Sequence, residues 1–129
     1  MIKKKKESGQ ALVEFALILP ILMVILCGIL DFGWIYYNKY KVEDAAYEGA
    51  RFASIAVEDS GVGDTLTEDT KQRVRQNLPN HGKGANITVT TGSGQVSVTV
   101  TYPVRNLTFV GWTVVGEYYY ATSTSVASI

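Results

Sequence analysis

The feature that most constrains this chain is a run of apolar residues from Ala11 to Leu30 that contains one charge, Glu14. About twenty helical residues, each rising roughly 1.5 Å, match the roughly 30 Å hydrocarbon core of a bilayer. Four lysines, Lys3 to Lys6, precede the run. Because basic residues stay on the cytoplasmic side of a membrane helix, the sequence predicts a single-pass plasma-membrane protein. Its N-terminus is expected in the cytoplasm and its C-terminal part outside.

Glu14 is an unusual residue for a simple membrane anchor. A carboxylate in an apolar helix costs on the order of 2–3 kcal/mol or more in lipid, so it needs a partner. A cut after Gly9 would place a free α-amine on Gln10, near Glu14. An amine and a carboxylate in a low dielectric can neutralise each other within one helix or between neighbouring helices. The alternative is an uncleaved signal anchor in which Glu14 reaches the lipid headgroups.

Charge and residue content argue against several functional classes. The 129-residue chain has a formal net charge of zero, with an excess of positive charge in residues 1–9 and of negative charge in the remainder. No basic patch favours a nucleic-acid partner. The only cysteine, Cys27, lies in the apolar run, and the only histidine, His81, lies in a predicted loop. These residues form neither a catalytic set nor a metal site, so we expect no enzyme activity, metal or cofactor.

The chain divides into four predicted segments. Residues 1–9 form a leader, 10–32 a transmembrane helix that Pro20 should bend, 33–56 an extracytoplasmic helix, and 57–129 a small helix with an antiparallel sheet. Aromatic residues just beyond the apolar run are typical of a membrane interface, although packing on the outer domain is an equal alternative. They are Trp34, Tyr36, Tyr37 and Tyr40.

The extracytoplasmic helix carries a stripe of mostly small residues at helical spacing, which favours close packing against another backbone. The stripe consists of Ile35, Val42, Ala46, Gly49, Ala53 and Ala56. On the same helix, Glu48 and Arg51 are three residues apart and can form an ion pair. A polar loop from Glu58 to Gly63 should end this helix.

The remaining segment begins with a helix. Its start is predicted from the capping-box spacing of Thr65 and Glu68, and its end from Pro79. Its buried face is expected to hold Leu66, Thr70, Val74 and Leu78.

Alternation of apolar and polar residues then predicts strands on both sides of Gly92–Gly94, with Pro103 ending the second strand. The apolar residues 107–115 are too short to span a membrane and should either fold over the sheet or touch the membrane surface. A last strand is expected from Glu117 to Ala127. The predicted fold class is α+β, with a long helix continuing into a small antiparallel sheet domain.

Two motifs resemble a known family. Gly9, then four residues, then Glu14-Phe15 at the head of an apolar helix resembles the processing site of type IV prepilins. The string from Gly9 to Pro20, together with Glu48, Gly49 and Arg51 in Ala-Ala-Tyr-Glu-Gly-Ala-Arg, is similar to TadE-like pseudopilins of tight-adherence (Flp) pilus systems. Val-Thr-Val-Thr-Tyr-Pro at 98–103 also resembles the family pattern, which extends the resemblance to about Pro103.

The resemblance implies a pilin-like, membrane-anchored minor pseudopilin of Flp pilus assembly or secretion. A prepilin peptidase would cut between Gly9 and Gln10, and Phe15 would serve helix packing or peptidase recognition. The implied partners are the membrane, the peptidase, other pilins or pseudopilins, and the Tad assembly machinery. Gln10 is polar where many type IV pilins begin with an apolar aromatic residue. The alternative function is an uncleaved single-pass protein whose outer domain binds a ligand through aromatics near Trp112 and Tyr118 to Tyr120.

Overall fold

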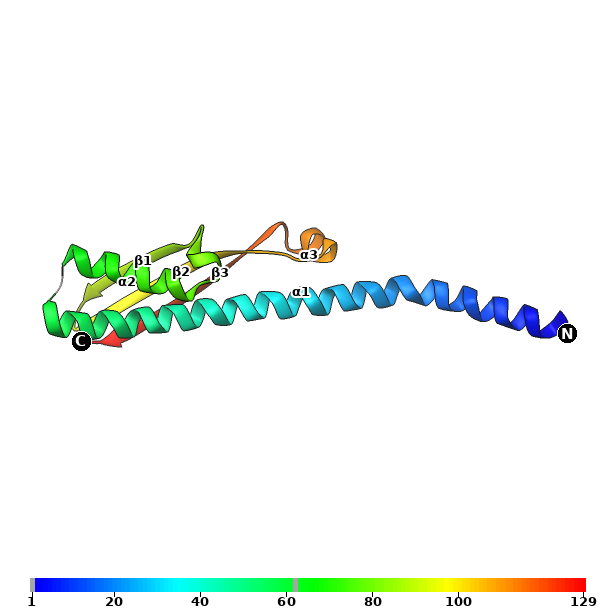
Figure 1. Ribbon diagram of the computed structural model, residues 1–129, viewed down its shortest axis with the longest axis horizontal. Coiled ribbons are helices and arrows are strands. Elements are labelled where there is room, and N and C mark those ends of the chain that lie inside the picture. The colour runs from blue at the N-terminus through cyan, green and yellow to red at the C-terminus, as the bar shows by residue number, and fades with distance from the viewer. Residues whose placement is uncertain (1, 62) are drawn as a thin grey trace.

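The computed structural model describes residues 2–61 and 63–129, with side chains from Glu7 onward within these ranges. One helix, α1 (Ile2–Ser60), runs the full length of the molecule. A three-stranded antiparallel sheet and two further helices lie along its C-terminal half, while its N-terminal half projects alone (Figure 1). The predicted α+β class is therefore confirmed. The predicted orientation depends on Lys3 to Lys6, whose side chains lie outside the described residues.

The N-terminal half of α1 has the character of a membrane segment. It contains a stretch long and apolar enough to cross a bilayer, and none of that stretch is buried within the chain. Pro20 lies inside the helix, which continues through it because one missing hydrogen bond bends a long helix without ending it. Figure 1 shows that the blue, N-terminal part of the ribbon is inclined to the rest.

The C-terminal half of α1 packs through small residues. Val42, Ala46, Gly49 and Ala53 of the predicted stripe are buried, and Ala45 and Ala50 widen it. The helix does not end at the loop expected from Glu58 but continues to Ser60. Gly61, with a φ of 76°, then donates its N–H to the carbonyl of Val57 at 2.9 Å. The polar residues of the last turn are exposed and can remain helical. The helix ends where the glycine adopts the left-handed conformation. Val62 of the expected loop is outside the described residues.

The second helix, α2 (Asp64–Asn77), begins two residues earlier than the predicted capping box requires. Gly63 occupies the N-cap position, and no side-chain hydrogen bond caps this helix, so the predicted role of Thr65 is wrong. The expected inner face is confirmed, because Leu66, Thr70 and Val74 are buried. A single turn, η1 (Pro79–Gly82), follows α2 and contains the exposed His81.

One face of the sheet packs against α1, and the central strand supplies most of the buried side chains. Strands β1 (Asn86–Gly92), β2 (Gln95–Arg105) and β3 (Tyr118–Ser128) pair in that order, all antiparallel. Alternate β2 residues are buried against the small residues of α1, as the sequence pattern predicts. The core residues of β2 are Val96, Val98, Val100, Tyr102 and Val104. The outer face is polar and carries threonine pairs, including Thr99 with Thr124 at 3.0 Å.

Pro103 does not end β2, contrary to expectation. The strand continues to Arg105, and Pro103 pairs with Tyr120 of β3. The ladder between β1 and β2 has already ended at Thr101. Beyond that residue β2 has a neighbour on one side only, so a proline without an N–H donor is tolerated there.

Candidate functional site

The predicted processing residues lie on an uninterrupted helix. Gly9, Gln10, Glu14 and Phe15 all belong to α1 and are all exposed, Phe15 to 61%. The sheet domain covers only the opposite half of α1 (Figure 1). The bond between Gly9 and Gln10 is therefore accessible from outside the chain, but it lies in helical backbone.

The helix brings Gln10 and Glu14 onto the same face. Residues four apart on an α-helix are neighbours, one turn above the other. Helical side chains also lean towards the N-terminus, so the Glu14 carboxylate is directed towards Gln10. A helix beginning at Gln10 would place a positive α-amine and the positive end of the helix dipole near this carboxylate. The geometry fits the expected charge pairing within one helix, and the exposure of Glu14 equally allows pairing between helices.

The second motif lies where α2 approaches α1. A Cβ atom on Gly49 would lie 2.3 Å from Val74 Cγ2, so only glycine allows this approach. Glu48 Oε1 lies 3.5 Å from Arg73 Nη2 of α2. The sequence predicts Arg51 as the partner, so the predicted ion pair is replaced by one between two helices. Arg51 is exposed, and its carbonyl accepts a 2.9 Å hydrogen bond from Ser54 Oγ. Gly49 thus allows α2 to pack closely on the long helix, and Glu48 adds a partly exposed ion pair to this contact.

The structure gives a role to Asp31, which in the sequence only follows the end of the apolar run. Asp31 is only 5% exposed, and its carboxylate accepts hydrogen bonds from a segment far along the chain. Oδ1 accepts from the backbone N–H of Leu107 at 3.1 Å and of Thr108 at 2.9 Å. Oδ2 accepts from the backbone N–H of Gly111 at 2.9 Å and from the Thr108 hydroxyl. We call this arrangement the Asp31 clamp.

The Asp31 clamp holds a short helix, α3 (Phe109–Val114), against α1. A Cβ atom on Gly111 would lie 2.7 Å from Asp31 Oδ2, so the close approach requires glycine. Two indoles secure the same region: Trp34 Nε1 donates to the carbonyl of Arg105 at 3.1 Å, and Trp112 Nε1 donates to that of Asn106 at 3.0 Å. Trp34 therefore packs on the outer domain, one of the two predicted alternatives, whereas Tyr36, Tyr37 and Tyr40 are exposed.

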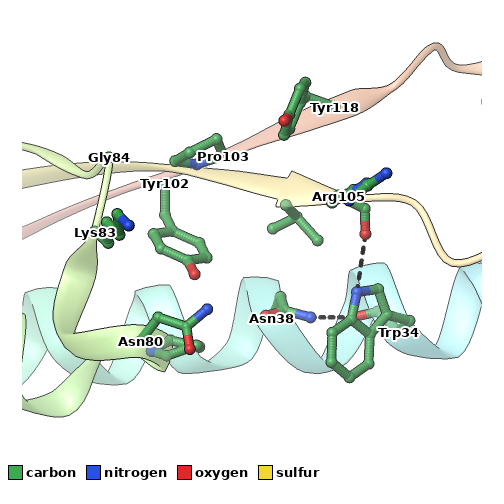
Figure 2. A pocket seen from close by; sticks show the side chains of 11 residues that line it. Trp34, Asn38, Asn80, Lys83, Gly84, Tyr102, Pro103, Arg105 and Tyr118 are labelled. Carbon is green, nitrogen blue, oxygen red and sulfur yellow. Dashed lines mark hydrogen bonds between the residues drawn. The ribbon is translucent and has the colours of Figure 1, made fainter.

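A pocket of about 470 Å³ lies between α1, η1 and the adjacent ends of β2 and β3. Figure 2 shows Trp34 and Asn38 on α1 at one end of the pocket, below Arg105, and Tyr102 of β2 projecting towards Asn80 at the other end. Trp112 does not line it, although Tyr118 does. Across the described residues, no group of three or more His, Cys, Asp and Glu side chains could hold a metal ion.

Comparison with known proteins gives a match that covers the N-terminal part of the chain. Residues 9–51 match the model of the family described as TadE-like protein. The match begins at Gly9, includes Glu14 and Phe15, and ends at Arg51. The predicted extension of the resemblance to Pro103 lies beyond it and stays a prediction. No curated protein and no solved structure matches the chain. The family match supports a membrane-anchored protein associated with a Tad pilus, and residues 9–51 of the chain are similar to TadE-like proteins.

Proposed function

We propose that this chain is a minor pseudopilin of Tad (Flp) pilus assembly or secretion. A membrane prepilin peptidase cuts it between Gly9 and Gln10, and the mature protein remains anchored until it joins or primes the assembly. In this proposal the chain is a substrate of an enzyme and not itself an enzyme. Its N-terminus lies in the cytoplasm and its sheet domain outside.

One observation carries the proposal: Glu14 is exposed on an apolar helix that is not buried within the chain, one turn after the Gly9–Gln10 bond. Ionisable residues in membrane helices are costly and mark functional contacts. Here the partner is the α-amine released at Gln10, on the same chain or on a neighbouring pilin. The α-amine neutralises the carboxylate when apolar helices assemble away from water.

The first test is the N-terminal sequence and intact mass of membrane-extracted protein, with and without a co-expressed prepilin peptidase. We expect a peptidase-dependent N-terminus at Gln10. Gly9→Leu should remain uncut. Gly33→Leu should be cut normally, because Gly33 is another helical glycine of α1, and a Cβ atom added there would meet no neighbouring atom within 4 Å. An intact leader on the wild-type chain in the presence of an active cognate peptidase would refute the proposed processing.

The second test separates assembly from cleavage. We expect Glu14→Ala to be cut normally but to fail to support piliation, because the α-amine of Gln10 then has no carboxylate to pair with. Glu7→Ala is the matched control: Glu7 is also an exposed acid of α1, but it leaves with the leader. Normal piliation in Glu14→Ala would refute the role of Glu14, whereas a piliation defect in Glu7→Ala would point to a general effect of helix charge.

The pocket beside Trp34 favours a second candidate, an uncleaved anchor whose outer domain binds a ligand. Its volume of about 470 Å³ is in the range of small-molecule sites. Asn38 and Tyr102 contribute polar groups to its wall (Figure 2). This candidate predicts that residues 1–9 are retained in the mature protein, so the same N-terminal sequencing distinguishes the two functions.

A further inference from the structure

The segment that contains α3 exposes an unusually apolar surface. Phe109 and Val114 are each 77% exposed, far more than apolar side chains that pack on a domain. Leu107, Trp112 and Val115 are exposed as well. From Asn106 to Gly116 the sequence contains no charged residue. Contiguous apolar surface of this kind marks contact with a protein or a membrane.

The Asp31 clamp fixes where this surface lies. Asp31 directly follows the apolar run that ends at Leu30, and it binds the backbone of residues 107–111. An apolar groove between α1 and α3 is lined by Gly28, Phe32 and Ile35 on one side and by Val110 and Val114 on the other. The exposed side chains of α3 therefore continue the apolar surface of α1 at its domain-side end. Figure 1 shows α3 beside the middle of α1, at the end of the sheet domain nearest the projecting half.

We propose that α3 is a second membrane contact, inserted at the boundary between headgroups and hydrocarbon in the leaflet nearest the sheet domain. If residues 11–30 cross the hydrocarbon core, Asp31 stands at that boundary, and the clamp holds α3 at the same depth. Phe109 and Val114 then enter the lipid. Trp34 and Trp112 lie at the level that tryptophans favour in membranes. The proposal requires α1 to be the membrane span, but it does not depend on cleavage after Gly9.

The same geometry explains why a carboxylate is acceptable at this depth. Burying an ionised group near lipid is costly unless hydrogen bonds satisfy it. Three backbone N–H groups and one hydroxyl supply those bonds to Asp31. A single membrane helix leaves its domain free to rotate about the helix axis. A second contact on one side of α1 removes that freedom and fixes which face of the sheet domain points away from the membrane.

The test uses the full-length chain, one molecule per lipid nanodisc, so that other copies cannot cover α3. In a Cys27→Ala background, a nitroxide label is attached after Phe109→Cys, Val114→Cys, Ile25→Cys or Val126→Cys. Ile25 reports the predicted span. Val126 is the matched control, because it is an apolar residue that is 54% exposed, near the far end of β3. The measurement is the accessibility of each label to oxygen, which concentrates in lipid, relative to a water-soluble nickel chelate.

We expect the oxygen-to-nickel ratios after Phe109→Cys and Val114→Cys to lie well above that of Val126→Cys and below that of Ile25→Cys, because Ile25 lies deeper in the hydrocarbon. Ratios at the two α3 positions equal to that of Val126→Cys would place α3 in water and overturn the proposal. A low ratio at Ile25→Cys would overturn it as well, by removing the span on which it rests. N-terminal sequencing still decides the cleavage proposal in either case.

Discussion

Replacing Asp31 with alanine should release α3 while leaving the sheet intact. A hydrogen bond to a charged group contributes about 1.5–3 kcal/mol. The Asp31 carboxylate accepts four, of which the bond from the Gly111 N–H is buried. Water can replace some of these hydrogen bonds. If only two are lost, the free energy of local opening falls by at least about 3 kcal/mol. Since each 1.4 kcal/mol is a factor of ten, exchange of the amides in this segment should accelerate about 100-fold.

Hydrogen–deuterium exchange of the full-length protein, read by mass spectrometry, tests this prediction. Peptides covering residues 107–115 should exchange faster in Asp31→Ala, because local opening exposes their N–H groups. Peptides covering β2 should keep their wild-type rates up to Val104, since the core beside α1 is unchanged. Asp44→Ala is the matched control, because Asp44 is an exposed aspartate of the same helix. Unchanged exchange at 107–115, or an equal acceleration throughout the sheet, would refute the reasoning.

Two further predictions concern the contact between α1 and α2, and both are measured as thermal unfolding midpoints in detergent. Gly49→Ala should destabilise the protein by up to about 2 kcal/mol, because a clash with Val74 outweighs the roughly 1 kcal/mol gain in helix propensity. The control Gly33→Ala adds a Cβ atom in open space and should be neutral or stabilising. A stabilised Gly49→Ala would contradict the packing described. Glu48→Gln should cost less than about 1 kcal/mol, and high salt should abolish the difference, because the pair with Arg73 is partly exposed.

Local patterns are sufficient to predict most of the elements. Period-two alternation in β2 and the spacing of Val42, Ala46 and Gly49 predict the two faces that meet in the core, because both reflect burial along a single element. The turn at Gly92–Gly94 is equally local. The family resemblance is matched over residues 9–51, whereas its predicted extension to Pro103 stays a prediction.

Contacts between distant segments cannot be predicted in this way. The Asp31 clamp joins residues 76 to 80 positions apart, and no local pattern predicts which acid will receive the N–H groups of a later loop. Glu48 has two possible arginine partners, and only the placement of α2 selects Arg73. The strand end expected at Pro103 is wrong because tolerance of this proline depends on where the neighbouring strand β1 ends, which is a property of the sheet and not of β2.

The two halves of α1 differ in what can bind them. From Asp31 onward the helix is held by its own domain, whereas the apolar stretch before it is unburied within the chain. Lipid chains are about as apolar as the side chains they contact, so moving this surface from lipid to neighbouring helices gains little hydrophobic free energy. Glu14, by contrast, costs on the order of 2–3 kcal/mol in lipid until a positive charge joins it. In the proposed function, pairing of that carboxylate is therefore the larger drive for specific assembly from the membrane, and Glu14 is a more decisive residue to test than Phe15.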